Sequence, residues 1–375
     1  MQHYVYIDSR TLIGTFEMLI RYIHDGVFPA DFVLLIKHRW YLTRFYKKLL
    51  NEQQIKYRII YNAKDIESLT DGIVYYIVNH NSNLSLMANR KLKHVFVTHG
   101  ESNKFTSVKP IIRAYDEVCV AGQAGIDRYL EIGLFSQYDV DTKRIKITAD
   151  KYIGRTGLSK QGQEVIFYAP TWEGIIPQQE NYSSLPFVEQ VVENIVNCAN
   201  KTNIRTVLIK PHPNTGLKNK KYFQYLEEIT QRLKQENLTV LIYYFNLNRI
   251  YRITPAYYFN YTFLFFLHKH RIKNMATIVH DLSAYSAKIA FCDISAMETQ
   301  ILNENIPYYL FSAEKNKGVK FLDFVNTDNP YTQYYQNAKI VLGEKTTALK
   351  EINQDDFVKL KEYVVNNNER KSFFS

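Results

Sequence analysis

The chain is poor in the residues that build loop-rich and disulfide-stapled proteins. Its 375 residues include only 14 glycines, 10 prolines and 3 cysteines. So few glycines and prolines argue against an all-β architecture with many tight turns. Cys119, Cys198 and Cys292 each lie in an apolar run and have no CxxC spacing. This excludes a disulfide framework or a zinc site and predicts core residues in a reducing compartment.

Long hydrophobic runs and targeting segments are also lacking. The most apolar stretch, residues 256–267, has about half of the ~20 residues that a membrane-spanning helix needs. The first ten residues, MQHYVYIDSR, have the pattern of a strand and not that of a signal peptide. We therefore expect a cytoplasmic protein that is not exported and does not cross the bilayer.

Basic residues outnumber acidic ones. Lys and Arg total 47 against 37 for Asp and Glu, a formal net charge of +10. This excess favours anionic partners such as nucleotides, phosphorylated polymers or an acidic membrane face. No dense Lys/Arg run occurs, which argues against nucleic acid as a partner. A generic solubilising charge is the alternative.

Short β-rich runs alternate with helical patterns along the chain. This predicts βα units and parallel sheets. Strands are expected at residues 3–8, 32–37, 57–61, 73–78, 95–98, 117–121, 144–148, 164–168, 206–210, 238–243, 289–293 and 308–311. Helices are expected at residues 12–24, 41–53, 187–200, 222–235 and 355–367, with one more beginning at Ser295.

The alternation restarts after a polar, glycine-bearing segment at residues 153–163, IGRTGLSKQGQ, which is the best linker candidate. The fold class is therefore α/β, with two doubly wound, Rossmann-like domains that face a central cleft. The expected divisions are an N-terminal acceptor-side domain at residues 1–155, a nucleotide-donor-binding domain at residues 156–345 and a C-terminal helical segment at residues 346–375.

Polar residues follow four of the predicted strands, where an α/β protein builds its site. The first segment is HGESNK, in which His99 at a strand tip can act as a general base and Gly100 allows close approach of a ligand. The second is APTWEG, in which Thr171 offers a hydroxyl to a phosphate and Trp172 can wall a pocket. A surface histidine at a turn and a strand-end turn with a packed tryptophan are the structural alternatives.

The other two segments carry groups suited to anions. In IKPHP, two prolines hold His212 extended beside Lys210. In FCDISAMETQ, Asp293 ends a strand and Ser295 is a natural N-cap, so the helix that follows presents N–H groups and a positive dipole end to a diphosphate. Glu298 fits a capping box, which is the structural alternative for this segment.

Residues 243–273, from Tyr243 to Lys273, break the α/β pattern. The segment is dense in Tyr and Phe and ends in LHKHRIK. Such a stretch can lie on an anionic membrane surface, with its rings at the headgroups and its cations on the phosphates. The alternative is a buried insertion that packs on the second domain.

Together, the segments resemble the CDP-glycerol glycerophosphotransferase family, which builds teichoic acids and related capsular polymers. The similarity extends over residues 95–311 and includes HGESNK, KPIIRAYDEVCVAGQAGIDRYL, IGRTGLS, FYAPTWEG with YSSL after it, IKPHPNTG and FCDISAMETQIL. Residues 1–90 carry no such motif. One departure is Asp-Ile-Ser-Ala, which has a single hydroxyl where the family often has a pair.

The resemblance implies a GT-B fold with the donor bound mainly by the C-terminal domain. It implies that His99 and His212 are the catalytic pair and that the turn from Asp293 to Ser295 holds the donor's phosphates or polyol. The expected donor-binding residues are Gly100, Thr171, Lys210, Asp293, Ser295, Ala296 and Glu298.

The expected reaction transfers glycerol phosphate from CDP-glycerol to a hydroxyl of an anionic cell-surface polymer or its linker, and releases CMP. No cofactor and no metal are expected, and the enzyme would be peripheral on the inner face of the plasma membrane. The alternatives are ribitol phosphate transfer from CDP-ribitol, a GT-B glycosyltransferase that uses a nucleotide sugar, and a polymer-binding scaffold without activity.

Overall fold

The computed structural model places most of the chain. It describes residues 1–8, 13–39, 43, 47, 50–51, 53–97, 101–174, 182–216, 218–244, 270, 273–313, 339–342 and 354–366. The predicted helix at 41–53 and the aromatic-basic segment at 243–273 lie mainly outside the described residues. Within the described part, no helix is both long enough and apolar enough to span a membrane.

The first half of the chain forms a seven-stranded parallel sheet in the order β3-β2-β1-β4-β5-β6-β7. Its strands are β1 (His3–Ile7), β2 (Val33–Lys37), β3 (Tyr57–Ile60), β4 (Ile73–Tyr76), β5 (Lys93–Val97), β6 (Glu117–Val120) and β7 (Ile145–Ile147). Its helices are α1 (Ile13–His24), α3 (Ala63–Glu67), α4 (Leu84–Met87), α5 (Gln123–Glu131) and α6 (Gln137–Asp141), with 3₁₀ turns η1 (Asn81–Asn83), η2 (Phe105–Val108), η3 (Pro110–Ala114) and η4 (Ala149–Tyr152).

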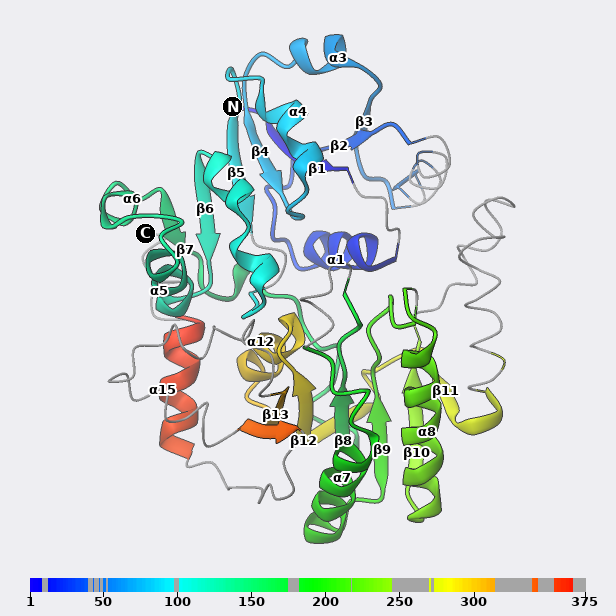
Figure 1. Cartoon of the computed structure of the whole chain (residues 1–375). Coiled ribbons are helices and arrows are strands. Elements are labelled where there is room, and N and C mark those ends of the chain that lie inside the picture. Colours follow the sequence, from blue (N-terminus) through cyan, green and yellow to red (C-terminus); the bar gives the residue numbers. More distant parts are fainter. Residues whose placement is uncertain are drawn as a thin grey trace.

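The second half forms another seven-stranded parallel sheet, in the order β11-β10-β9-β8-β12-β13-β14. Its strands are β8 (Gln163–Ala169), β9 (Thr206–Ile209), β10 (Thr239–Tyr243), β11 (Thr277–Val279), β12 (Tyr285–Asp293), β13 (Tyr308–Ala313) and β14 (Lys339–Leu342). Its helices are α7 (Val188–Thr202), α8 (Lys221–Gln235), α12 (Ala296–Asn303) and α15 (Gln354–Val364). Figure 1 shows one sheet above the other.

Both sheets are covered on both faces, which explains their continuous apolar strands. Along β8, Ile166 and Tyr168 join the core under α7 and α8, while Val165 and Phe167 join the core under α12 and α15. The first sheet divides its side chains between two cores in the same way. Alternate residues of one strand thus fill two different cores.

Strand order confirms the predicted fold class. In each sheet the chain starts near the middle, builds outward to one edge and then returns to build the other. The reversals fall between β1 and β4 and between β8 and β12, as in doubly wound dinucleotide-binding sheets. Two such sheets in succession constitute a GT-B fold. The connection between them, residues 148–162, contains the predicted division at residue 155, which stays a prediction.

Three features of the second sheet differ from expectation. The strands β11 and β14 were not predicted, and β12 begins at Tyr285 and not at residue 289. The extra residues of β12 pair with β8, Tyr285 with Gln163, across a register shift between Ala287 and Ile289. Because Lys288 interrupts the apolar run, the pattern marked only the buried end of this strand.

The three cysteines are buried and unpaired, as predicted.

The C-terminal helix α15 connects the two halves. It contacts α12 of the second half and α5 of the first (Figure 1). Tyr363 donates from its hydroxyl to Asp127 Oδ2 at 2.7 Å. A Cβ atom on Gly122 would lie 2.7 Å from the carbonyl oxygens of Tyr363 and Val364. Glycine at position 122 is therefore needed for this close approach.

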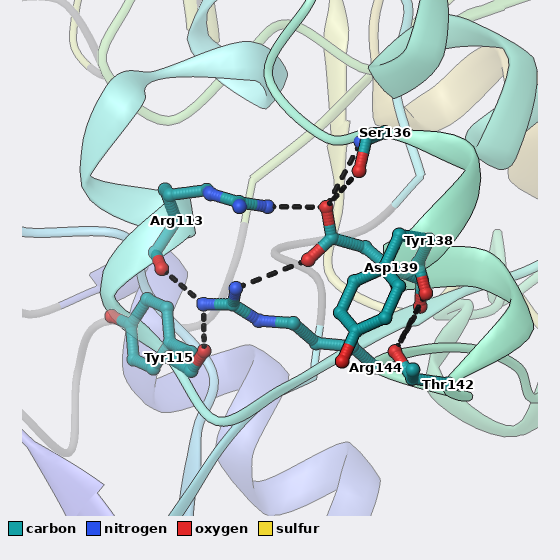
Figure 2. A network of polar contacts seen from close by, with 7 residues as sticks. All are labelled: Arg113, Tyr115, Ser136, Tyr138, Asp139, Thr142 and Arg144. Carbon is teal, nitrogen blue, oxygen red and sulfur yellow. Dashed lines mark hydrogen bonds and ion pairs between the residues drawn. The ribbon is translucent and has the colours of Figure 1, made fainter.

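A buried carboxylate fixes the β7 edge of the first sheet (Figure 2). Asp139 Oδ2 accepts from Ser136 N at 2.9 Å and from Arg113 Nη1 at 2.5 Å, while Oδ1 accepts from Arg144 Nη1 at 3.2 Å. Arg144 also donates to the carbonyl of Tyr115 at 2.9 Å. Although burial opposes ionisation, these hydrogen bonds and the two arginines hold the pKa of Asp139 well below its usual range.

We expect Asp139→Asn to lower the free energy of unfolding by about 3 kcal/mol at pH 7, because it leaves two guanidinium groups without their carboxylate. The pKa is depressed in the folded state, so this contribution is present above the unfolded pKa and is lost as the pH falls through the folded value. Asp141→Asn, on the exposed face of the same helix, is the control. Equal urea-unfolding curves for the two variants would contradict this assignment.

Candidate functional site

A buried ion pair fixes the segment that follows β5. Residues 98–100, including His99 and Gly100, lie outside the described residues. Glu101 is buried and pairs with Arg128 of α5. Its second oxygen accepts from Ala121 N at 3.0 Å, and its carbonyl accepts from Thr299 Oγ1 of α12 at 2.9 Å. The HGESNK segment is therefore attached to both halves of the molecule.

Lys104, from the same segment, reaches the second sheet. Its Nζ donates to Thr171 Oγ1 at 2.5 Å and lies 5.6 Å from the ring centroid of Tyr182. Burial lowers the pKa of Lys104 to about 8, while the charge of Asp293 opposes this shift. The ammonium is thus mainly protonated at pH 7 and is poorly compensated by its surroundings, so it can stabilise an incoming anion.

Asp293 lies at the carboxyl end of β12 and holds two turns together. Its Oδ2 accepts from Thr171 N at 2.6 Å and from Ser184 N at 3.1 Å. Its Oδ1 is buried and has no hydrogen-bond partner among the described residues. Burial raises the pKa of Asp293 to about 7, opposed by hydrogen bonds from Ser184 and Thr171 and by the charge of Lys104. Lys104, Thr171, Ser184 and Asp293 are called the strand-end cluster below.

The helix α12 begins at Ala296, three residues after this carboxylate. Ser295 has extended backbone angles, and its hydroxyl accepts from Met297 N at 3.2 Å, which confirms the predicted N-cap. Ala296 is the first helical residue, so the positive end of the helix dipole points toward the strand-end cluster. Glu298 is buried, and its Oε1 accepts from the Tyr308 hydroxyl at 3.2 Å. Its carboxylate thus contacts the neighbouring strand.

His212 stacks on Trp172, with ring centroids 5.4 Å apart and an interplanar angle of 10°. Its Nδ1 accepts from Asn214 N at 3.1 Å, so in the neutral ring the proton lies on Nε2. Neutral His212 can therefore donate a hydrogen bond through Nε2. The segment after β8, which carries Trp172, is therefore in direct contact with the segment after β9, which carries His212.

Glu173 secures the turn that follows His212. Its carboxylate has no exposed surface and accepts from the backbone N–H groups of Gly216 at 3.0 Å, Lys218 at 2.9 Å and Asn219 at 3.0 Å. Lys210, by contrast, donates from Nζ to the carbonyl of Thr156 at 3.0 Å. Lys210 is thus attached to the connection between the sheets.

The structure therefore brings together all four polar strand ends, through Lys104, Thr171 with Trp172, His212, and Asp293 with α12. The roles of the predicted residues stay predictions. Sequence reasoning missed Lys104, Ser184 and Glu173. Lys104 and Glu173 stand inside the quoted HGESNK and APTWEG motifs, so their charge was the available signal. Ser184 stands in the YSSL segment, where no charged side chain marked it.

Comparisons with known proteins leave the family of this chain open. No protein-family model and no curated protein matches the sequence. Among solved structures, MurG from Acinetobacter baumannii is similar over 99% of this chain and 98% of its own, with 9% identity and a TM-score of 0.48.

A trehalose-6-phosphate synthase is similar over 100% and 98% of the two chains, with 10% identity and a TM-score of 0.44. The ADP-heptose heptosyltransferase II of E. coli is similar over 98% and 100%, with 10% identity and a TM-score of 0.33. Scores this low support no conclusion about donor or acceptor. The fold class rests on the strand order, and the family resemblance stays a prediction.

We expect Glu173→Gln to lower the free energy of unfolding by roughly 2 kcal/mol, because the amide replaces an acceptor with a donor facing buried N–H groups. Hydrogen exchange at Gly216, Lys218 and Asn219 should accelerate at least tenfold. Glu164→Gln, at the exposed start of the preceding strand β8, is the control. Unchanged exchange at these three amides would refute the anchoring role.

The raised pKa of Asp293 predicts a pH-dependent stability. The folded state favours the protonated acid, so this contribution is complete below the unfolded pKa, near 4, and is lost as the pH rises through about 7. Asp293→Asn should therefore gain roughly 1–4 kcal/mol relative to wild type between pH 5 and pH 8. Asp31→Asn, at an exposed site, is the control, and its free energy of unfolding should equal that of wild type at both pH 5 and pH 8. A constant difference for Asp293→Asn in thermal unfolding would contradict the shift.

Proposed function

We propose that the protein is an enzyme that transfers glycerol phosphate from CDP-glycerol to a hydroxyl of a cell-envelope polymer or its linker, with release of CMP. The observation that carries this proposal is the convergence of the four polar strand ends, in which the Lys104 ammonium donates to Thr171, Thr171 donates to Asp293, and α12 begins shortly after Asp293. A cation and a helix N-terminus together suit the diphosphate of a nucleotide-activated donor. The motif resemblance supplies the choice of CDP-glycerol.

The charges of the strand-end cluster suit an anionic donor. Asp293 has a pKa near neutrality, so it can take a proton when a diphosphate binds, while Lys104 keeps its own. The bound anion would itself favour both protonated forms, because an added negative charge raises the pKa of each group. Binding therefore selects a cluster with net positive charge, and donor binding should take up protons near pH 7.

In the proposed reaction, the acceptor hydroxyl attacks the phosphorus that bears glycerol. A new P–O bond forms, the P–O bond to CMP breaks, and CMP leaves with the electron pair. His99 would take the proton from the attacking hydroxyl. His212 would donate through Nε2 to a phosphate oxygen, and Lys104 and α12 would stabilise the developing charge. No covalent enzyme intermediate and no cofactor are required.

The acceptor and the site of action complete the proposal. The net charge of +10 favours an anionic polymer and the acidic inner face of the plasma membrane. The segment from Tyr243 to Lys273 is the proposed membrane contact. Flotation with vesicles of anionic or neutral lipid, using the full chain and a variant with its basic end neutralised, measures this contact.

The proposal predicts CMP release from CDP-glycerol when a short glycerol-phosphate oligomer is added as acceptor. His99→Ala should reduce the rate by about 10²–10⁴-fold and His212→Ala by at least tenfold, since each removes a group that acts on the reacting atoms. His24→Ala, at the exposed end of α1, is the control and should retain full activity.

A donor panel decides between this reaction and its alternatives. Turnover of CDP-ribitol in place of CDP-glycerol would show that the transferred polyol is ribitol, while the proposed phosphotransfer reaction would stand. Turnover of a UDP-sugar, with transfer at the anomeric carbon, would overturn phosphotransfer while the fold stands. Acceptor binding that is unaffected by loss of both histidines, without turnover of any donor, would identify a scaffold.

A further inference from the structure

A second polar cluster lies at the carboxyl edge of the first sheet, where the strand order reverses between β1 and β4. Asp8 follows β1, Arg39 follows β2, and Asn79 and His80 follow β4. The strands β1 and β4 are paired in parallel, Tyr6 beside Tyr76, so these residues share one edge. Reversal points of this kind are where open α/β sheets bind ligands. These four residues are called the β1/β4 site.

Asp8 orients two of the side chains. Its buried carboxylate accepts from Arg39 Nε at 3.0 Å and from Nη2 at 2.8 Å and 3.1 Å, which fixes the plane of the guanidinium. The Arg39 side chain is 34% exposed, against 2% for Asp8. No described residue accepts from Arg39 Nη1, so this nitrogen presents N–H donors from a rigid support.

His80 is held in one tautomer. Its Nδ1 lies 3.0 Å from the carbonyl oxygen of Asp8. A carbonyl can only accept, so Nδ1 carries the proton and Nε2 of the neutral ring is left as an acceptor. The half-buried imidazole therefore offers a lone pair at the same edge where Arg39 offers donors.

Asn79 is the most informative member of the β1/β4 site. Both polar atoms of its side chain are buried, and neither has a hydrogen-bond partner among the described residues. A buried amide without hydrogen-bond partners destabilises a fold, and such groups are rare in native structures. Among the described residues, no hydrogen bond accounts for an amide at position 79.

The chemistry of these groups fits hydroxyls better than phosphate. The charge of Arg39 is already balanced by Asp8, so the β1/β4 site has no net positive charge to offer a dianion. It does offer donors on Arg39, an acceptor on His80 and both on Asn79. A hydroxyl donates one hydrogen bond and accepts up to two, so neighbouring hydroxyls of a polyol or sugar match this set.

We infer that the β1/β4 site binds the hydroxyl groups of the polyol or sugar end of the acceptor. This inference rests on the proposed function for the identity of the acceptor. Asn79 and Arg39 donate to one ligand oxygen, and His80 Nε2 accepts from a neighbouring hydroxyl. The acceptor is thereby held by the first sheet while the donor is held by the second.

The test is direct binding of a synthetic glycerol-phosphate trimer, measured by isothermal titration calorimetry without donor. Asn79→Leu removes the amide and keeps the side-chain size, so it should melt at or above the wild-type temperature and bind the trimer at least five- to tenfold more weakly. His80→Phe should lose affinity to a similar extent. Asn81→Ala, at an exposed position two residues further on, is the control and should bind like wild type.

Binding of CDP is measured in parallel and separates the two ideas. The inference predicts unchanged CDP affinity in all three variants. Failure of wild type to bind CDP, with the trimer result intact, would refute the proposed donor and leave the β1/β4 site standing. Trimer binding that is equally tight in wild type and in Asn79→Leu, or no trimer binding to wild type, would overturn the inference. A melting temperature of Asn79→Leu below that of wild type would show that Asn79 stabilises the fold, which would also contradict the inference.

Discussion

The hydrogen bonds from the backbone of Thr171 and Ser184 to the Asp293 carboxylate are the interaction on which the site depends. They join the turn after β8 to the end of β12, the two strands that flank the reversal point of the second sheet. Thr171 in turn accepts from Lys104, which belongs to the first half of the chain. A single buried carboxylate thus sets the positions of a helix N-terminus, a lysine and the turn that precedes Trp172.

This arrangement leaves charges in an environment that does not fully compensate them. Burial shifts the pKa values of Lys104 and Asp293 toward each other, to about 8 and about 7. Such pairs are common where a protein binds or transforms a charged ligand. The carboxylates Glu101, Asp139 and Glu173, by contrast, are buried among several donors, as expected of groups that support the fold.

Much of the fold could be predicted from the sequence because its strands are buried on both faces. The strands of the first sheet and most of the second were visible as apolar runs, and Ser295 was recognised as an N-cap from its position after Asp293. The polar half of β12 was missed because Lys288 and Ser286 interrupt the run. No local pattern reveals that β12 pairs with β8, because the paired residues Gln163 and Tyr285 are 122 residues apart in the sequence.

The site was predictable to a smaller extent. The polar residues at the strand ends indicated where a ligand site is expected. They did not indicate which side chains contact one another. Lys210 illustrates the limit, since its place at a strand end did not reveal that its ammonium donates to the Thr156 carbonyl, and its predicted anion contact stays a prediction. Asn79 illustrates the reverse, because an unremarkable asparagine becomes informative only when its burial and lack of partners are known.

The central claim is that both halves of the chain build one donor site around the strand-end cluster. A crystal structure of the protein with CDP tests it most directly. The account predicts the diphosphate at the first turn of α12, with Lys104 Nζ within hydrogen-bond distance of a phosphate oxygen. A diphosphate bound away from α12, with Lys104 still on Thr171 and no contact to the strand-end cluster, would contradict it.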